Sequence, residues 1–292
     1  MKNKKVDTQY RDLLQSILDN GIRSESQMEV DTITYLSPPS LRFDLSKEFP
    51  IITERKVSEK MWKGAVGELF GFINGARTHD QLTEYGCKWW KAWVNERKCS
   101  KRGLETGDLG PGSYGAAFHD FPTSEGETFN QFEAILQQIK ERPFLKTHFI
   151  TPWIPQYNVR IKGRTQKVVV CPCHGWINIR ILNNKLYLHM YQRSCDVPIG
   201  LPANLAQYAA LTLALAQVTG YKVGEYIHSF SDAHVYVDQV DKIKKLFKRE
   251  ARPLPKMILK NKKKNLFDYR ANDFELVNYD PHPGIWDIPV VV

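Results

Sequence analysis

Apolar residues recur at helical spacing in five segments of the chain. In residues 10–20 they line one face, and a glycine that can end a helix follows. Residues 60–74, 129–141 and 240–249 show the same spacing, the first with bulky aromatic and branched side chains. Residues 203–220 are apolar on nearly every side, a pattern that predicts a helix buried at the centre of the core.

Alternating apolar and polar positions predict strands in the middle of the chain. Residues 177–181 alternate cleanly, an Asn-Asn pair at 183–184 is typical of a tight turn, and residues 186–191 return, so we expect a hairpin. Residues 98–115 are rich in Gly, Ser and charge and are expected to form a long loop. Further short strands are predicted at residues 41–45, 148–153, 167–171, 226–229 and 234–237.

Composition agrees with a single domain of the α+β class over residues 1–292. The chain is 42% hydrophobic and 25% charged, and it shows neither a repeat nor a linker. No apolar run reaches membrane-spanning length and no hydrophobic segment follows the N-terminus, so neither an anchor nor a signal peptide is expected. Five cysteines without a paired or zinc-type spacing predict free thiols in a reducing, cytoplasmic compartment and no metal site.

The net charge of +9 is concentrated in residues 242–264. We expect this stretch to form a solvated helix face and loop. Two alternatives stay open, an electrostatic funnel for anionic substrates and weak binding of nucleic acid. The stretch lacks the interleaved aromatic residues of a dedicated nucleic-acid module.

Candidate chemistry centres on residues 171–174 (CPCH), just before the predicted hairpin. Arg193 and Asp196 follow its second strand, so one hairpin delivers a thiol, a guanidinium and a carboxylate. A cysteine is a good nucleophile only as the thiolate, which a nearby guanidinium favours. These residues predict covalent catalysis on a flat, electron-poor, anionic substrate.

A longer set of motifs contains these residues, and it resembles the thymidylate synthase family over nearly the whole chain. The resemblance implies a large mixed β-sheet backed by helices, and a homodimer that packs sheet against sheet. It also implies transfer of a one-carbon unit from 5,10-methylenetetrahydrofolate to C5 of dUMP, giving dTMP and dihydrofolate without a metal or nicotinamide. The matching segments are 49–53 (FPIIT), 67–70 (GELF), 90–93 (WKAW), 108–111 (DLGP), 172–174 (PCH), 191–196 (YQRSCD), 200–204 (GLPAN), 231–236 (SDAHVY), 267–270 (FDYR) and 279–285 (YDPHPGI).

The resemblance implies a catalytic role for six residues. Cys173 resembles the nucleophile, and Arg193 the arginine that contacts both substrate phosphate and sulfur and lowers the thiol pKa. Glu68 resembles the carboxylate that organises proton transfer, with Tyr114 and His174 in the same network. Asp196 resembles the carboxylate that holds the pterin ring of the folate.

The same resemblance implies how the two ligands are bound. Asn204 resembles the amide that reads the uracil edge, because an amide offers a donor and an acceptor together. On the substrate side it is joined by Arg193, Ser194, Gln192, Lys146, and by His234 and Tyr236 at the sugar. The folate side comprises Trp90, Trp93, Asp196, Ile199, Gly200 and Val291, the last in a C-terminal tail that closes over the ligands.

Three segments depart from the family pattern. Residues 23–32 lack the usual phosphate-binding arginine loop, although Arg23 lies nearby. The arginine pair that the family donates across the dimer aligns with residues 145–148, where Lys146 is the remaining cation. Ala203 and Pro198 stand where the family carries aromatic residues.

These departures leave alternatives open. One is a pyrimidine-nucleotide hydroxymethylase of the same fold, in which water replaces the hydride. Others are a relative kept for binding, for example of RNA, and an enzyme acting on an unusual pyrimidine nucleoside or nucleotide. The retention of Cys173, Arg193, Asp196, Asn204 and Glu68 favours an enzyme over the binding protein.

Overall fold

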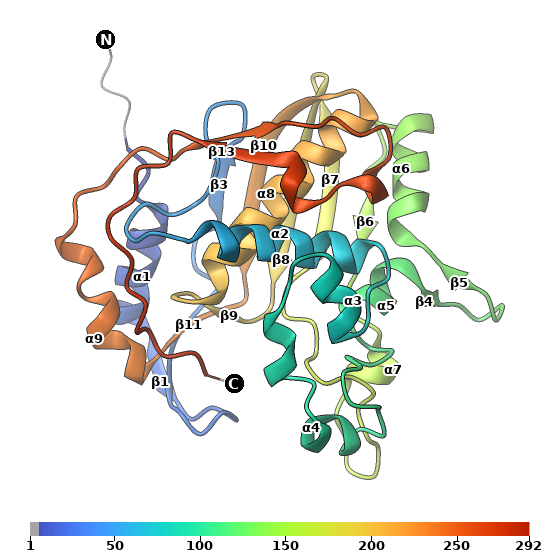
Figure 1. The fold of residues 1–292 in the computed structure, drawn as a ribbon, viewed down its shortest axis with the longest axis horizontal. Coiled ribbons are helices and arrows are strands. Elements are labelled where there is room, and N and C mark those ends of the chain that lie inside the picture. Colours follow the sequence, from blue (N-terminus) through green and yellow to red (C-terminus); the bar gives the residue numbers. More distant parts are fainter. Residues whose placement is uncertain (1–5, 292) are drawn as a thin grey trace.

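The largest sheet of the protein lies in the middle of the molecule (Figure 1). The computed structural model describes residues 6–291. Within this range the sheet is built in the order β3 (Leu41–Asp44), β10 (Lys222–Phe230), β8 (Lys185–Gln192), β7 (Trp176–Leu182) and β6 (Phe149–Ile150). β10 runs parallel to β8 and the other neighbours are antiparallel, so the sheet is mixed, as predicted.

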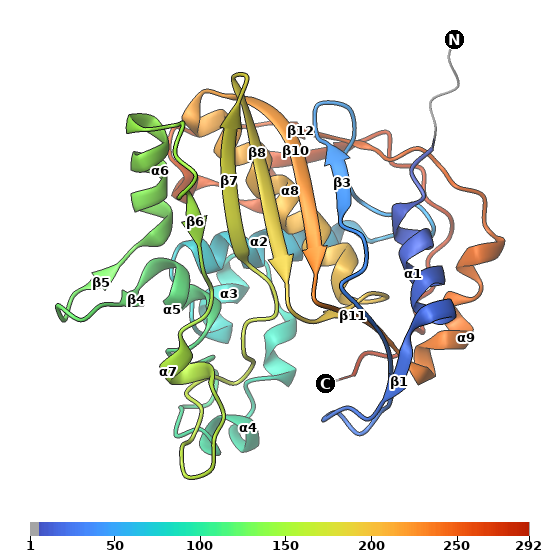
Figure 2. The ribbon, with the colours of Figure 1, turned by 180° about the vertical axis from the view of Figure 1, so that it is seen from behind.

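Helices cover one face of this sheet. α8 (Gly200–Thr219) packs on β8 and β10, and α2 (Glu59–Ile73) packs on α8. Because α8 lies between the sheet and α2, it is apolar on nearly all sides, and it ends at Gly220 in the left-handed conformation (φ 79°). Seen from behind, the opposite face of the sheet carries no helix formed by residues 6–291 (Figure 2).

The face without helices, called the open face below, carries aromatic and polar side chains. Side chains alternate along β8, so Leu188 and Met190 are buried under α8 while Tyr187 and Tyr191 lie on the open face. Tyr191 is 38% exposed and meets Trp176 edge to face at 5.8 Å. The open face is therefore partly apolar and lacks a partner within the described chain.

A smaller sheet stands beside the ends of β8 and β10. Its order is β1 (Ile22–Ser24), β2 (Thr32–Leu36), β11 (Asp232–Tyr236) and β9 (Cys195–Asp196), and α1 (Gln9–Asn20) contacts β2 and β11. β9 follows β8 and β11 follows β10 within a few residues. The two sheets therefore meet where the strands of the large sheet end.

The remaining elements surround this framework. None of the helices in residues 6–291 is long and apolar enough to cross a membrane. The remaining helices are α3 (His79–Glu84), η1 (Trp89–Ala92), α4 (Glu96–Ser100), α5 (Tyr114–His119), α6 (Gln131–Glu141), α7 (Pro155–Asn158), α9 (Val240–Ile243) and further 3-10 turns. The remaining strands form the short ladders β4 (Phe121–Pro122)–β5 (Thr128–Phe129) and β12 (Lys256–Leu259)–β13 (Phe274–Val277).

Several sequence-based predictions of secondary structure were wrong in detail. Residues 167–171 form no strand, because Val169 N–H donates to the carbonyl of Leu109 in a loop instead. The expected helix 240–249 divides into α9 and a 3-10 turn, and the expected strand 148–153 shortens to β6. The expected loop 98–115 contains the end of α4 and the start of α5.

Candidate active site

Cys173 and Arg193 meet at the open end of the β7–β8 hairpin. Asn183 and Asn184 close its other end with positive φ angles of 48° and 57°, as the predicted tight turn requires. Cys173 lies in the loop that leads into β7, and Arg193 directly follows β8. The Arg193 N–H donates to the Cys173 carbonyl at 2.8 Å, which fixes the two backbones together.

The guanidinium of Arg193 is held against the cysteine loop. Its Nε donates to the carbonyl of Pro172 at 2.7 Å, and Nη2 donates to that of Cys171 at 3.0 Å. Nη2 also lies 3.5 Å from Sγ of Cys173. Nη1 has no hydrogen-bond partner within residues 6–291, so the arginine can still bind an anion beside the sulfur.

Burial changes the expected ionisation of the thiol. The positive charge of Arg193 acts to lower the pKa of Cys173, as predicted, but burial is the larger effect and raises that pKa above its ordinary value of 9.0. The prediction of a net lowered pKa was therefore wrong for the free protein. The thiol is protonated at neutral pH until something compensates for its burial.

Tyr114 and His174 form an aromatic column next to the sulfur. The hydroxyl of Tyr114 accepts the Cys173 backbone N–H at 2.7 Å, and its ring stacks on His174 at 4.6 Å. Nδ1 of His174 lies 2.6 Å from the hydroxyl of Tyr208 on α8. Burial lowers the pKa of His174 to about 3, so this imidazole is neutral at physiological pH.

Glu68 is a buried carboxylate on α2 with several hydrogen-bond donors. Its Oε1 accepts the indole N–H groups of Trp89 and Trp90 at 2.7 and 2.6 Å, and Oε2 accepts the Gln207 amide at 2.6 Å. Burial raises the pKa of Glu68, while these donors act in the opposite direction because they stabilise the charged form.

A chain of amides connects Glu68 to Asn204. Nδ2 of Asn204 donates to Gln207 at 2.9 Å, and Oδ1 accepts from Gln192 at 3.0 Å. Gln192 in turn lies 2.8 Å from Nε2 of His228, which fixes the amide orientations. Asn204 keeps a second N–H and a second lone pair, so it can offer a donor and an acceptor to a planar ring.

Asp196 lies beside the C-terminal tail. Its oxygens accept from Nε2 of Gln239 at 3.3 Å, and the same nitrogen donates to the carbonyl of Pro289 at 3.0 Å. Gln239 therefore attaches the tail next to the carboxylate, and Ile288 is buried nearby in the chain. Burial raises the pKa of Asp196 from 3.8 to about 6.

His234 and Tyr236 lie on β11 with a row of hydroxyl groups beside them. Strand register pairs His234 with Thr34 and Tyr236 with Thr32, so all four side chains point to one face. Thr34 donates to Oγ1 of Thr32 at 3.3 Å, and Thr32 lies 3.2 Å from the hydroxyl of Ser24. Residues 23–32 thus form a hairpin end in place of the family's arginine loop.

Arg23, Lys146 and Trp93 take part in none of the contacts described above within residues 6–291. Arg23 pairs with Asp31 at 2.8 Å, and Lys146 is exposed just before β6. Trp93 does not join Trp90 at Glu68 and instead has the ammonium of Lys98 4.6 Å from its ring centre. The other predicted site residues not placed above, Ser194, Ile199, Gly200 and Val291, are all partly buried.

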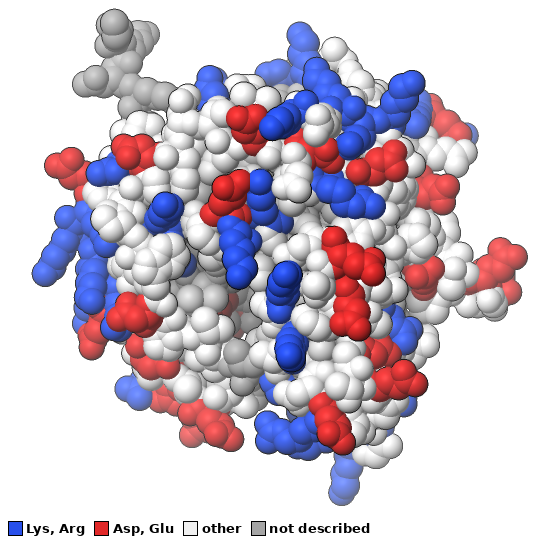
Figure 3. Space-filling view, viewed as in Figure 1, with Lys and Arg blue, Asp and Glu red and all other residues white. Residues whose placement is uncertain are grey.

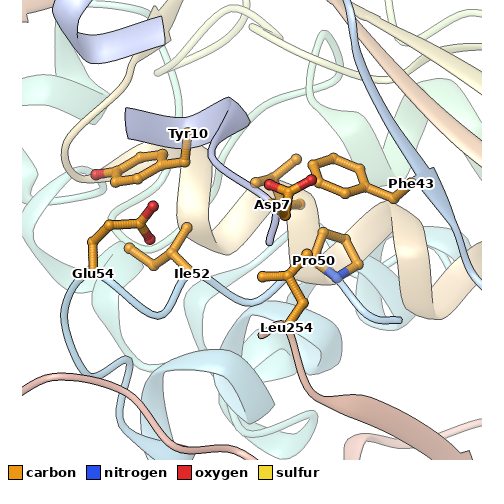
Figure 4. A pocket seen from close by; sticks show the side chains of 8 residues that line it. Asp7, Tyr10, Phe43, Pro50, Ile52, Glu54 and Leu254 are labelled. Atoms are coloured by element: carbon orange, nitrogen blue, oxygen red, sulfur yellow. The ribbon is translucent and has the colours of Figure 1, made fainter. Parts of the chain in front are cut away.

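Cavities do not identify the site. A gap of about 10 Å³ under α1 can hold at most one water molecule (Figure 4). A groove of about 420 Å³ opens between α2 and Arg270, with Lys60, Lys63 and Tyr85 in its lining. Neither reaches Cys173, so the hydrogen-bonded cluster around the thiol is the better guide to the chemistry.

The basic stretch 242–264 behaves as a protein surface. Lys242 pairs with Asp287, and Lys263 pairs with Asp273 at 3.1 Å. On the face drawn in Figure 3, positive and negative side chains are interspersed. These pairs favour the solvated-surface interpretation over a nucleic-acid site.

Sequence reasoning missed five residues that shape this cluster. Gln207 could have been found, because it lies one helical turn after Asn204 on a buried helix where a polar side chain needs a partner. The others, Trp89, Tyr208, Gln239 and Thr34, carry no motif, and only tertiary packing brings them to the site.

The fold therefore places a cysteine beside an arginine, next to a buried network of hydrogen-bonded side chains. The family model described as Thymidylate synthase matches residues 8–292, nearly the whole chain. The chain therefore belongs to the thymidylate synthase family.

Proposed function

We propose that this protein transfers a one-carbon unit from 5,10-methylenetetrahydrofolate to C5 of dUMP, giving dTMP and dihydrofolate. The observation that supports it most is the position of Arg193. Its guanidinium is fixed by two carbonyls, lies 3.5 Å from the sulfur of Cys173, and keeps Nη1 for an anion. One residue can thus bind a phosphate and stabilise the thiolate.

Covalent addition explains why a cysteine is needed. The thiolate of Cys173 forms a bond to C6 of the uracil ring, and the electron pair moves to C5, which becomes nucleophilic. C5 then bonds to the one-carbon unit and loses its proton, and the C6–S bond breaks when the product forms. The folate supplies the methylene carbon and the hydride that reduces it, and is itself oxidised to dihydrofolate.

The chain's own residues hold the ring and manage the protons. Asn204 is oriented by Gln192 and Gln207, so its free N–H and lone pair can read O4 and N3–H of uracil. Through Gln207 the same amide is connected to Glu68, whose carboxylate serves as the base of the network. The neutral His174 can donate or accept without adding charge to the site.

Asp196 fits the pterin of the folate. A pterin presents N–H donors along one edge, and a partly accessible carboxylate that accepts only long hydrogen bonds can take stronger ones. Gln239 links this carboxylate to the carbonyl of Pro289, so a bound ring would lie next to the tail. Closure of the tail there would exclude water from the reacting carbon.

Trapping the covalent adduct tests this proposal. The full-length protein is incubated with 5-fluoro-dUMP and methylenetetrahydrofolate, and its intact mass is measured. We expect a mass increase equal to both ligands in the wild-type protein and none in Cys173→Ser. An unmodified wild-type protein that is folded and dimeric would contradict the proposed chemistry.

A hydroxymethylase is the second candidate, because Ala203 precedes Asn204 where the family carries a bulky residue. A small side chain leaves room for the water that would replace the hydride. The two reactions differ in the fate of the folate, since only methylation oxidises it. Absorbance of dihydrofolate together with a methyl mass on the product supports methylation, and a hydroxymethyl mass without oxidation supports the alternative.

The row of hydroxyl groups beside β11 gives a reason to test UMP as a second substrate. Thr34 faces the sugar-side pair and has donated its proton to Thr32, so its lone pairs can accept a hydrogen bond from a further sugar hydroxyl. UMP carries such a hydroxyl and dUMP does not. We compare kcat/KM for UMP, dUMP and deoxyuridine in the wild type and in Thr34→Val. A UMP preference that Thr34→Val removes would support the ribonucleotide.

A further inference from the structure

Trp89 is the one donor to Glu68 that reaches it from the surface. Its ring is 39% exposed, whereas Trp90 is 7% exposed, and both indole N–H groups end on the same oxygen, Oε1. The two residues are neighbours in η1, so their side chains leave the backbone in different directions. Converging on one atom therefore requires a specific fold of this turn around the carboxylate.

Helix α2 is shaped to receive the Trp89 ring. Gly64 lies one turn before Glu68, and a Cβ there would stand 2.7 Å from Cζ3 of Trp89. Gly67 lets the backbone of Tyr85 approach even more closely, since a Cβ would stand 1.9 Å from its carbonyl oxygen. These contacts bring the segment before η1 against the helix and place the indole over Gly64, with its N–H directed to Glu68.

We propose that Trp89 is a positioning residue for Glu68. Its indole N–H holds Oε1 in place and favours the carboxylate form, while Oε2 stays directed toward Gln207 and Asn204. Trp89 touches neither ligand in this role and acts through Glu68. The kinetic part of the proposal depends on the proposed function, in which Glu68 is the base.

The direction of the effect follows from electrostatics. An N–H donor stabilises a carboxylate but not a carboxylic acid, so loss of the donor raises the pKa of Glu68 further. A base is active only when ionised, so the acid limb of the kcat profile should move to higher pH. The expected shift in Trp89→Phe is about 1 pH unit, the size of one charge-assisted hydrogen bond.

The test compares pH profiles of kcat in the full-length protein. Trp89→Phe should shift the acid limb and leave KM for dUMP within about twofold, which a general loss of structure would not do. Gly64→Ala should give the same shift, because the new methyl group displaces the indole without removing it. Trp62→Phe on the same helix is the control and should leave the limb in place.

A second measurement does not depend on turnover. Protonation of Glu68 should change the fluorescence of the adjacent indoles, so a pH titration of the wild type should show a transition that Glu68→Gln abolishes. In Trp89→Phe the remaining transition should move to higher pH. An unshifted transition and an unshifted acid limb in a folded Trp89→Phe would overturn the proposal. If the wild-type protein had no activity but its fluorescence transition still moved to higher pH in Trp89→Phe, only the proposed function would be contradicted.

Discussion

Two carboxylates of the candidate site, the buried Glu68 and the partly buried Asp196, have different surroundings. Glu68 accepts three N–H donors at 2.6 to 2.7 Å, whereas Asp196 accepts from Gln239 and from the backbone of Ile199 only at 3.3 Å. Short donors compensate for much of the cost of burying a charge, and long ones compensate for less. Asp196 is therefore a poorly satisfied acceptor in the free protein, which suits a residue that waits for a ligand.

This difference predicts a stability gain in Asp196→Asn. The folded-state pKa of about 6 exceeds the unfolded value of 3.8, so the group adds stability as the pH falls through this interval and costs stability above it. Asparagine removes the charge, and we expect it to stabilise the free protein at pH 8 by about 1 to 3 kcal/mol. Urea unfolding at pH 8 and pH 4 measures the effect.

At pH 4 the advantage of Asp196→Asn should largely disappear, because the wild-type carboxyl is then protonated in the folded state. Asp287→Asn is the control, since that exposed carboxylate pairs with Lys242 and should bring no gain. An equal advantage at both pH values would show that packing, not charge, is responsible. The same Asp196→Asn protein should bind the reduced folate more weakly.

At the scale of elements, secondary structure was predictable where the apolar residues follow one dominant period. It was not predictable where their spacing fits two kinds of structure. The alternation at 177–181 and the apolar run at 203–220 gave β7 and α8, because each pattern has one structural solution. Residues 240–249 were misread because Ile243 and Leu246 are buried three positions apart, a spacing that a 3-10 turn satisfies as well as an α-helix.

Of the candidate site, the motif residues were predictable and their tertiary partners were not. The proximity of Cys173 and Arg193 was predictable from sequence because the hairpin that joins them is local. Trp89 and Gln239 reach Glu68 and Asp196 from distant segments. Such pairings depend on how elements pack, which no local pattern records.

Close packing of α2 predicts that Gly67→Ala is strongly destabilising. The added methyl group would lie 1.9 Å from the backbone carbonyl of Tyr85, which cannot rotate away as a side chain can. Overpacking of this kind costs about 1 to 3 kcal/mol, more than alanine gains over glycine in a helix. Gly71→Ala is the matched control, because its methyl group meets side-chain atoms and no backbone, Cδ2 of Leu82 at 3.0 Å and the ring of Tyr85 at 3.3 Å. Thermal unfolding should rank Gly67→Ala well below Gly71→Ala, and equal losses would contradict the argument.

At the scale of the whole molecule, the open face is the surface best suited to a second copy of this chain. Residues 6–291 place no helix on this sheet face, and its aromatic side chains include the edge-to-face pair Trp176–Tyr191. Two copies related by a twofold axis can cover it completely, as the sequence resemblance implies. Lys146 lies beside this face, because Asn178 on β7 donates to its carbonyl at 3.4 Å. The resemblance implies that a partner packed there would receive Lys146 near its own site.

A dimer that packs through the open face, as the resemblance implies, predicts that a charge on this face blocks both assembly and activity. Ile227 lies at the centre of the sheet, between Arg42 on β3 and His189 on β8. Ile227→Asp should convert the dimer to a monomer in light scattering, because the carboxylate would lose its water at the interface. Phe129→Asp, at an apolar position on β5 that is 49% exposed and lies away from this face, should leave a dimer. A dimeric Ile227→Asp protein would place the interface elsewhere.

Mixed dimers can show whether Lys146 acts across the interface. Cys173→Ser subunits lack the proposed nucleophile, and Lys146→Ala subunits lack the cation that would bind the partner's phosphate. If Lys146 serves the other subunit, a mixed dimer has one complete site, since the intact Cys173 faces the intact Lys146. Random reassociation of equal amounts should then restore about a quarter of the wild-type activity, because half of the dimers are mixed and each has one working site. If Lys146 serves its own subunit, mixing restores nothing beyond the activity of Lys146→Ala alone, and the missing arginine pair has no counterpart in this lysine.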